Sequence, residues 1–177
     1  PEMVKNIKAI RVGKETTEID EKISNDEEIK IIVNKTVIGN FSMSPEHIKE
    51  FVIGYLLGEG LISSADDITD ITIEGRTVKV NTDLADFDLR RELVMSSDCF
   101  GGMRGKLELT KKVESDFKVT KEEIFKASKR LREESKIWSE TGGTHIAALI
   151  NKDNIITTED VSRHVAIDKV IGAAALD

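Results

Sequence analysis

The residue with the clearest capacity for chemistry is Cys99, the single cysteine of the 177-residue chain. It lies in residues 96–106, Ser-Ser-Asp-Cys-Phe-Gly-Gly-Met-Arg-Gly-Lys, whose glycines and serines predict a loop. A cysteine on such a loop can act as a reactive thiolate, and Arg104 and Lys106 would favour that ionised form. The alternative is a small buried side chain beside a turn, although the loop composition opposes burial. The residues alone leave both interpretations open.

The shortage of soft ligands argues against a zinc site. One cysteine cannot form an internal disulfide, and it cannot supply a cysteine-rich zinc site. Because the chain also has only three histidines, we expect neither structural nor catalytic zinc. A zinc deaminase needs a His or Cys ligand, a later Cys-x-x-Cys pair and a catalytic Glu, which one cysteine cannot provide.

A second candidate for chemistry is the sequence Thr141-Gly142-Gly143-Thr144-His145. A glycine pair lets backbone amides approach a phosphate or a ring closely. The histidine then begins an apolar run that predicts a buried strand. The alternative is a helix C-terminus followed by a strand-edge histidine with ordinary hydrogen bonds, and spacing alone favours this alternative.

A third candidate is the charged segment 159–169, Glu-Asp-Val-Ser-Arg-His-Val-Ala-Ile-Asp-Lys. If it is helical, Asp160, His164 and Asp168 lie one turn apart on one face. Carboxylates at that spacing can fix the tautomer of a histidine. The alternative is a solvated helix face with weak ion pairs, which is the usual role of such charge runs.

Hydrophobic periodicity indicates the elements that position these residues in the first half. Residues 29–33 and 36–38 predict one β-hairpin, and residues 71–73 and 78–80 predict another. Between them, Ser44 can cap a helix that begins at Pro45. The apolar face of that helix is formed by Ile48, Phe51, Val52, Tyr55 and Leu56. The first half therefore predicts a small α+β unit.

The second half predicts an α/β layer. Thr120 and Glu123 form a capping box for a helix over residues 121–138. Strand 146–150 has a neighbour at 155–157, and residues 160–176 are expected to be helical. Acidic and polar residues 82–92 indicate a boundary between an N-terminal domain over 1–92 and an α/β core over 93–177. The inner side of the first of these helices is expected to be Ile124, Ser128, Leu131, Ser135 and Trp138.

Composition is typical of a globular protein. Apolar residues make up 39% of the chain and charged residues 33%, and no apolar run approaches the roughly 20 residues that span a bilayer. The N-terminal residues carry no apolar signal region. The net charge of −7 argues against generic nucleic-acid binding, which depends on neutralising phosphates. We therefore expect a cytoplasmic protein that binds neither nucleic acid nor a membrane.

Together and in this order, these segments resemble the signatures of the formate dehydrogenase accessory sulfurtransferase family. Residues 141–148 are similar to that family's Thr-Gly-Gly-x-His-x-Ala stretch. Residues 159–172 are similar to its Glu-Asp-x-x-Arg-His-Asn-Ala-x-Asp-Lys-x-x-Gly block, which is long and specific. The likeness spans about residues 28–172. Upstream, the matching stretches are Val33-Asn34, Met43-Ser44-Pro45 and Gly54-Tyr55-Leu56-Leu57-Gly58-Glu59-Gly60.

The resemblance implies a cytidine-deaminase-like three-layer core with a small N-terminal α+β domain, in a homodimer. It also implies a sulfur relay, in which a cysteine desulfurase loads a persulfide onto Cys99. The sulfur then passes to a substrate, the molybdenum bis(molybdopterin guanine dinucleotide) cofactor of formate dehydrogenase. The residues expected to bind that cofactor, among which a guanine nucleotide could be held, are Gly142, Gly143, Thr144, His145, Arg163, His164 and Asp168.

Three departures from the family pattern affect these expectations. The family loop often carries Cys-Gly-x-Cys-Gly, whereas this chain has Gly102 at the second cysteine position. Val165 stands where Asn is usual, and the family continues beyond Asp177 with a Gly-Phe-x-Arg-Gly-type stretch implicated in cofactor binding. The lost cysteine favours an alternative from another class, a non-catalytic chaperone that binds the cofactor without transferring sulfur.

Overall fold

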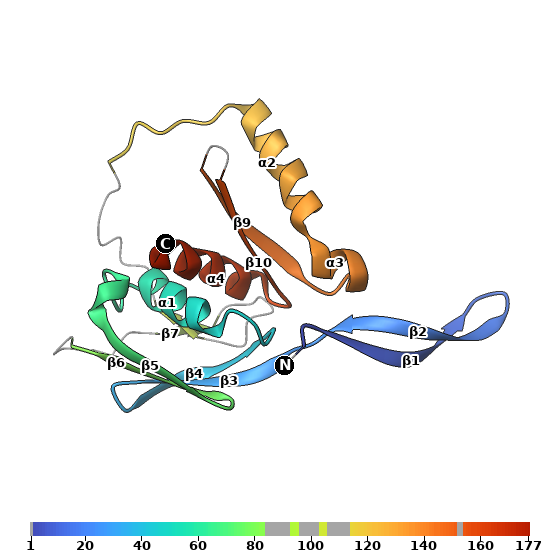
Figure 1. Cartoon of the computed structure of the whole chain (residues 1–177), viewed down its shortest axis with the longest axis horizontal. Coiled ribbons are helices and arrows are strands. Elements are labelled where there is room, and N and C mark those ends of the chain that lie inside the picture. Colours follow the sequence, from blue (N-terminus) through green and yellow to red (C-terminus); the bar gives the residue numbers. More distant parts are fainter. Residues whose placement is uncertain (1, 84–92, 96–102, 106–113, 152–153) are drawn as a thin grey trace.

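The computed structural model describes residues 2–83, 93–95, 103–105, 114–151 and 154–177, and within these ranges it combines several β-sheets with four α-helices (Figure 1). The mixed α+β class expected from the sequence is confirmed. The elements are β1 (Val4–Val12), β2 (Thr16–Ser24), β3 (Glu27–Val33), β4 (Thr36–Met43), α1 (Ile48–Gly58), a 3₁₀ turn (Ala65–Asp67), β5 (Ile68–Glu74), β6 (Thr77–Thr82), β7 (Leu93–Met95), β8 (Met103–Gly105), α2 (Lys121–Glu134), α3 (Lys136–Thr141), β9 (His145–Asn151), β10 (Asn154–Asp160) and α4 (Arg163–Leu176).

The largest sheet has the strand order β4-β3-β6-β5, with β3 and β6 parallel and the other neighbours antiparallel. Both hairpins predicted in the first half are confirmed. Asn34 and Lys35 join β3 to β4 with φ angles of 45° and 71°, as a tight hairpin turn of matching twist requires. The Asn34 side chain also exchanges hydrogen bonds with Thr82, which fixes the end of β6 against this turn.

Helix α1 covers one face of this sheet, and its apolar face agrees with the prediction. Phe51 and Tyr55 pack around Phe41 of β4, with ring centroids 5.3 Å and 5.0 Å from that ring. Alternate residues of the strands complete a closed apolar core. Its buried members are Ile29, Ile31, Val33, Phe41, Met43, Phe51, Val52, Tyr55, Leu56, Ile62, Val78, Val80 and Val165.

The predicted start of this helix is wrong. Helix α1 begins at Ile48 and not at Pro45, and the residue before it, His47, has a left-handed backbone with φ 55°. Ser44 does not cap the helix, because its hydroxyl accepts a hydrogen bond from the Val161 amide and its carbonyl accepts one from Lys169. A partner more than a hundred residues away has replaced the local cap.

Helix α4 crosses α1 with the two backbones in direct contact, and Figure 1 shows the two helices side by side. A Cβ atom on Gly54 would lie 1.7 Å from the Asp168 carbonyl oxygen. A Cβ atom on Gly172 would lie 1.8 Å from the Glu50 carbonyl oxygen. Real side chains do not tolerate such distances, so glycine at both positions allows the second half of the chain to pack on the first.

The two neighbouring strands predicted in the second half are confirmed as β9 and β10, and they pair as an antiparallel hairpin. Helix α4 covers one of its faces, where Ala147, Ala166 and Val170 are buried. The predicted helix over 160–176 begins later, at Arg163, because β10 continues to Asp160. The contact between hairpin and helix is also polar, since the Thr158 hydroxyl donates to the Ala166 carbonyl at 2.7 Å.

The single helix predicted over 121–138 is instead two helices, α2 and α3, separated at Ser135. The capping box is confirmed, because the Thr120 hydroxyl accepts from the Glu123 amide and the Glu123 carboxylate accepts from the Thr120 amide. The predicted inner side is only partly right. Ser135 is buried and Leu131 half-buried, whereas Ser128, Ile124 and Trp138 are exposed.

Strands β1 and β2 form a two-stranded antiparallel ribbon that extends away from the rest of the molecule (Figure 1). No sequence pattern predicted this ribbon. At its base, the Asn25 amide donates to the Met3 carbonyl at 2.8 Å. Along β2, Lys22 forms an ion pair with Glu140 of α3 at 2.7 Å. The ribbon therefore reaches the segment that precedes the two glycines of the second candidate site.

Two expectations from the sequence are not settled by these elements. The predicted domain boundary at 92/93 borders residues 84–92, which lie outside the described residues, and it stays a prediction. None of the helices in the described ranges is long and apolar enough to cross a membrane.

Candidate functional site

The β9–β10 hairpin brings two of the three candidate segments together. In its antiparallel register His145 lies opposite Asp160, and Ile146 lies opposite Glu159. The glycine-containing segment 141–145 enters β9 at the end of the hairpin where β10 leaves toward α4. Residues that are 13 and 15 positions apart in the sequence therefore share one edge of the fold.

The glycine segment is fixed from both sides. Gly142 ends α3 with φ 64°, and its amide donates to the Trp138 carbonyl at 2.7 Å. On the other side, the Ser24 hydroxyl of β2 donates to the Gly143 carbonyl at 3.0 Å. A Cβ atom on Gly143 would lie 2.3 Å from that hydroxyl, so the β1–β2 ribbon can approach only because residue 143 is glycine.

Glu159 connects this segment to β10. One carboxylate oxygen accepts from the Ile137 amide at 2.9 Å, and the other accepts from the Trp138 amide at 2.8 Å. The second oxygen also accepts from the Thr144 hydroxyl at 2.8 Å. The first turn of α3 and the residue before β9 are therefore held by the same side chain.

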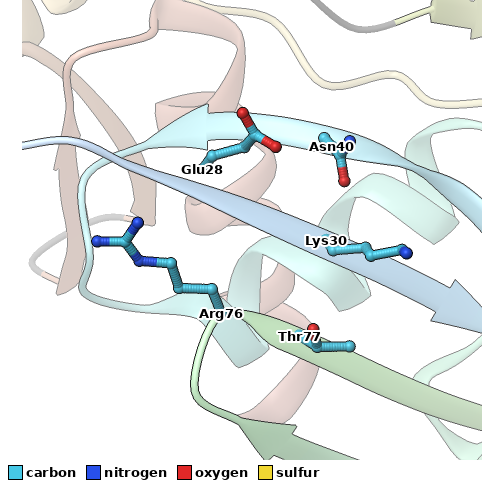
Figure 2. Close-up of a pocket in the computed structure, with 5 residues that line it drawn as sticks. All are labelled: Glu28, Lys30, Asn40, Arg76 and Thr77. Atoms are coloured by element: carbon cyan, nitrogen blue, oxygen red, sulfur yellow. The ribbon is translucent and has the colours of Figure 1, made fainter.

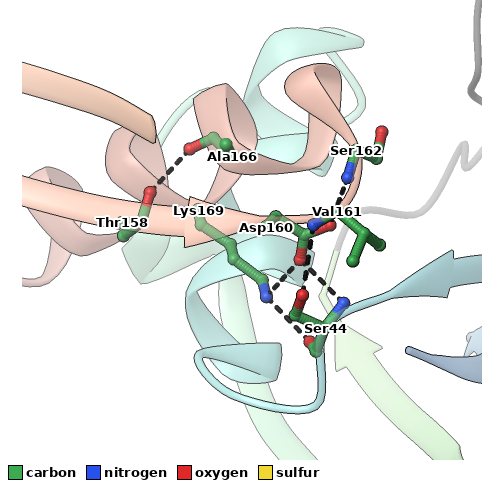
Figure 3. Close-up of polar contacts among 7 residues, drawn as sticks. All are labelled: Ser44, Thr158, Asp160, Val161, Ser162, Ala166 and Lys169. Atoms are coloured by element: carbon green, nitrogen blue, oxygen red, sulfur yellow. Dashed lines mark hydrogen bonds and ion pairs between the residues drawn. The ribbon is translucent and has the colours of Figure 1, made fainter. Parts of the chain in front are cut away.

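The Asp160 side chain lies on the face of β10 opposite to that of Glu159. It is completely buried, as is its partner Lys169 (Figure 3). Its carboxylate accepts from the Lys169 ammonium at 2.6 Å, from the Ser44 amide at 2.9 Å and from the Ser162 amide at 2.8 Å. Burial raises the pKa of the Asp160 carboxyl, although the Lys169 charge opposes this shift. Burial also lowers the pKa of Lys169, against the effect of the Asp160 charge.

These contacts correct one interpretation of the sequence. Asp160 was placed one helical turn before His164 on a single helix face, but it is the last residue of β10. Asp168 is buried against α1, since a Cβ atom on Gly58 would lie 3.7 Å from its carboxylate. His164 is half-buried, so Asp160, His164 and Asp168, the three predicted members of the face, have different surroundings. Arg163 beside them is exposed.

The remaining predicted site residues also differ in burial. Thr144 is buried and donates to Glu159, whereas Gly142, Gly143 and His145 are exposed. Together with Arg163, these exposed residues are available to a ligand at this end of the hairpin.

Cys99 lies outside the described residues, as do Gly102 and Lys106. In the sequence it falls between β7 and β8, which pair antiparallel with Val94 opposite Arg104. The roles predicted for the loop cysteine therefore stay predictions. In the described part of the chain, no group of three or more His, Cys, Asp or Glu side chains is arranged to hold a metal ion.

A separate hollow lies on the outer face of the four-stranded sheet, on the side away from α1. Figure 2 shows that its lining comes from adjacent strands and carries both signs of charge. Lys30 lies opposite both Asn40 and Thr77 in the sheet register. The hollow is open and contains none of the predicted residues, so we do not assign it a ligand. Its lining residues are Glu28, Lys30, Asn40, Arg76 and Thr77.

Comparison with known proteins identifies relatives of this chain. A model of the FdhD/NarQ family matches residues 24–177. The sulfur carrier protein FdhD of Methanothermobacter thermautotrophicus is 46% identical over 175 residues, which is 99% of this chain and 71% of that protein. This chain belongs to the FdhD/NarQ family.

Other similar proteins are more distant. The sulfur carrier protein FdhD of Saccharolobus solfataricus is 35% identical over 137 residues, and the match covers 76% of this chain but 53% of that protein. A crystal structure of a formate dehydrogenase accessory protein from Desulfotalea psychrophila matches with a TM-score of 0.73 at 23% identity. That match covers 99% of this chain and 68% of the other, and it shows a shared fold. The family resemblance inferred from the motifs is confirmed.

Sequence reasoning missed the residues that hold this site together. Ser24 was given no role, Ser44 was misassigned as a helix cap, and Glu159 and Lys169 were noted only as parts of a motif. Their hydrogen bonds join residues far apart in the sequence: Ser24 and Gly143 are 119 positions apart, and Ser44 and Lys169 are 125 apart. Glu159 and Ile137 are 22 positions apart. The adjacent carboxylates at the end of a strand, followed by a helix, were the one local signal available.

Proposed function

We propose that this protein is a sulfur carrier that serves the maturation of formate dehydrogenase. The observation that supports this most is the 46% identity, over nearly the whole chain, to a relative named sulfur carrier protein FdhD. The hairpin that joins residues 141–145 to Asp160–His164 adds a structural reason, because both motifs behind the resemblance lie at one edge of the fold.

The proposed chemistry is a persulfide relay through Cys99. The Cys99 thiolate attacks the outer sulfur of a persulfide on a cysteine desulfurase, and the donor's sulfur–sulfur bond breaks. The desulfurase cysteine leaves as a thiolate, and Cys99 becomes the persulfide. The receiving substrate is the molybdenum bis(molybdopterin guanine dinucleotide) cofactor of formate dehydrogenase. We expect a homodimer acting in the cytoplasm, with a cytidine-deaminase-like three-layer core over residues 93–177.

The guanine nucleotide portion of that substrate has suitable partners at the end of the hairpin. The backbone at Gly142 and Gly143 is exposed. Gly142 leaves room for a close approach, because nothing lies within 4 Å of where its Cβ atom would stand. Arg163 is exposed and can offer two parallel N–H groups to a phosphate. Guanosine diphosphate should therefore raise the melting temperature of the full chain, because it binds the folded state only. Equal melting temperatures with and without saturating nucleotide would remove this pocket from the proposal.

Replacement of Cys99 tests the relay directly. Cys99→Ser should keep a near-wild-type melting temperature, gain no sulfur and give no active formate dehydrogenase. Mass spectrometry after incubation with a desulfurase and cysteine should show a gain of about 32 Da on the wild type, the mass of one persulfide sulfur. The matched control is Cys99→Ser/Ser128→Cys, which moves the thiol to an exposed position of α2 and should not restore activation.

A second candidate function is a chaperone that binds the cofactor and transfers no sulfur. The specific observation in its favour is Gly102, which occupies the position of the second cysteine in the family loop. Unchanged activation of formate dehydrogenase by Cys99→Ser, at unchanged stability, would reject the relay and support the chaperone.

A further inference from the structure

Glu159 and Asp160 are adjacent residues of β10, so their side chains point to opposite faces of the hairpin. Glu159 accepts hydrogen bonds from the segment that leads into β9. Asp160 binds the segment that leads into α4, Lys169 of α4 itself and the chain before α1. We propose that these two carboxylates are positioning residues, each holding one of the two segments that face the guanine nucleotide. This inference rests on the proposed function and adds the residues that set its binding geometry.

The Glu159 contacts close a small loop. Its carboxylate binds the amides of Ile137 and Trp138 at the start of α3, which have no partner within the helix because they lie in its first turn. It also binds Thr144, which follows the two glycines. Because both ends of the glycine segment are attached to one rigid strand, the exposed backbone of Gly142 and Gly143 is held at a fixed distance from β10.

The Asp160 contacts determine how the chain turns from β10 into α4 (Figure 3). Its bond to the Ser162 amide, two residues on, is the local hydrogen bond of an aspartate turn. Lys169 binds both the Asp160 carboxylate at 2.6 Å and the Ser44 carbonyl at 2.9 Å. The Val161 amide completes the set by donating to the Ser44 hydroxyl. The direction in which Arg163 leaves this turn is therefore set by buried polar bonds.

Stability alone does not account for this buried pair. A buried ion pair commonly gives no more stability than apolar side chains of similar volume, because removing two charges from water is costly. A polar network in which the members are bonded does specify one geometry, since any shift leaves a buried group without its partner. A ligand that must meet two segments at once requires such a fixed geometry.

Amide hydrogen exchange on the full chain tests the inference without any ligand. Glu159→Gln should speed exchange of the Gly142 and Gly143 amides by at least about tenfold and leave Val161 and Ser162 within about twofold. Asp160→Asn should give the reverse pattern. If Asp160→Asn does not fold because Lys169 is left charged, Asp160→Asn/Lys169→Met removes that charge and should still loosen only residues 161–162. The control is Glu74→Gln, an exposed carboxylate paired with Lys79, which should change neither segment.

The second readout is the dissociation constant for guanosine diphosphate, measured by calorimetry at a temperature where each variant is folded. Both positioning variants should bind at least about tenfold more weakly than wild type, and Glu159→Ala more weakly than Glu159→Gln, which keeps one acceptor oxygen. Exchange that rises equally in both segments, or in neither, overturns the inference. Unchanged affinity with lowered stability also overturns it. If wild type binds no nucleotide, the proposed pocket fails, and the exchange pattern still decides whether each carboxylate holds its own segment.

Discussion

The core around α1 and the region around the β9–β10 hairpin are stabilised by different means. Large apolar side chains fill the first, where Phe51, Leu56 and Ile31 are completely buried. The second buries only small apolar side chains of β9 and α4 and leaves Phe125 and Trp138 exposed at 73% and 52%. Its geometry depends instead on hydrogen bonds that the Glu159 and Asp160 carboxylates accept. The candidate ligand segments lie in this second, polar region, where individual bonds and not close packing set their positions.

The largest expected effect is on the free energy of unfolding, and replacing a phenylalanine by alanine in each region tests it. Phe51→Ala removes a fully buried ring from the core and should lower the free energy of unfolding by about 3–5 kcal/mol. Phe125→Ala removes an exposed ring from α2 and should change it by no more than about 0.5 kcal/mol. Urea unfolding measures both values. Similar losses in the two variants would mean that α2 is packed as tightly as α1, and the contrast between the regions would not hold.

A second prediction concerns the buried pair that joins the regions. Lys169→Met leaves the Asp160 carboxylate buried without its cation and should cost about 3–5 kcal/mol. The double variant Lys169→Met/Asp160→Leu removes both charges and should recover most of that loss, as measured by urea unfolding. A double variant as unstable as the single one would show that the hydrogen bonds around Asp160 stabilise the fold in addition to pairing the two charges.

The same pair gives a pH dependence whose sign follows from the two pKa shifts. Burial raises the pKa of Asp160. Its contribution to folding stability is therefore complete below the ordinary aspartate pKa of about 3.9, and it is lost as pH rises through the pKa of the folded state. Burial lowers the pKa of Lys169. Its contribution to folding stability is therefore complete above the ordinary lysine pKa of about 10.4, and it is lost as pH falls through the pKa of the folded state. The stability of wild type minus that of the double variant should therefore be smallest at intermediate pH.

A third prediction tests the helix crossing between the regions. Gly172→Ala adds a Cβ atom 1.8 Å from the Glu50 carbonyl oxygen and must push α4 away from α1, at a cost of about 1–3 kcal/mol or more. Gly13→Ala is the matched control, because its Cβ atom would meet only the Glu15 carbonyl at an ordinary 3.7 Å. Thermal unfolding of the two variants measures the difference. Equal melting temperatures would show that the crossing adjusts freely.

The contrast also explains which features the sequence could predict. Hairpins and the apolar face of α1 were predicted correctly, because alternation and helical spacing are local patterns that packing then uses. Ser44 was misassigned as a helix cap because its actual partners, Asp160 and Lys169, are more than a hundred residues away. The segments at Gly143 and Arg163 were singled out by residue type and given a binding role by resemblance, whereas their positioning depends on side chains whose roles no local pattern shows.

The smallest expected effect is at the β1–β2 ribbon, where an exposed ion pair accompanies the Ser24–Gly143 hydrogen bond. Lys22 and Glu140 are 2.7 Å apart, but their side chains are 51% and 46% exposed, so water and salt screen their attraction. Lys22→Ala should lower the free energy of unfolding by no more than about 1 kcal/mol. A double-mutant cycle with Glu140→Ala, at low salt and at about 1 M sodium chloride, isolates the pair, and its coupling should shrink at high salt. A coupling above about 2 kcal/mol that persists in salt would mean that the ribbon is an integral support of the glycine segment, and the polar region would then be held from three sides.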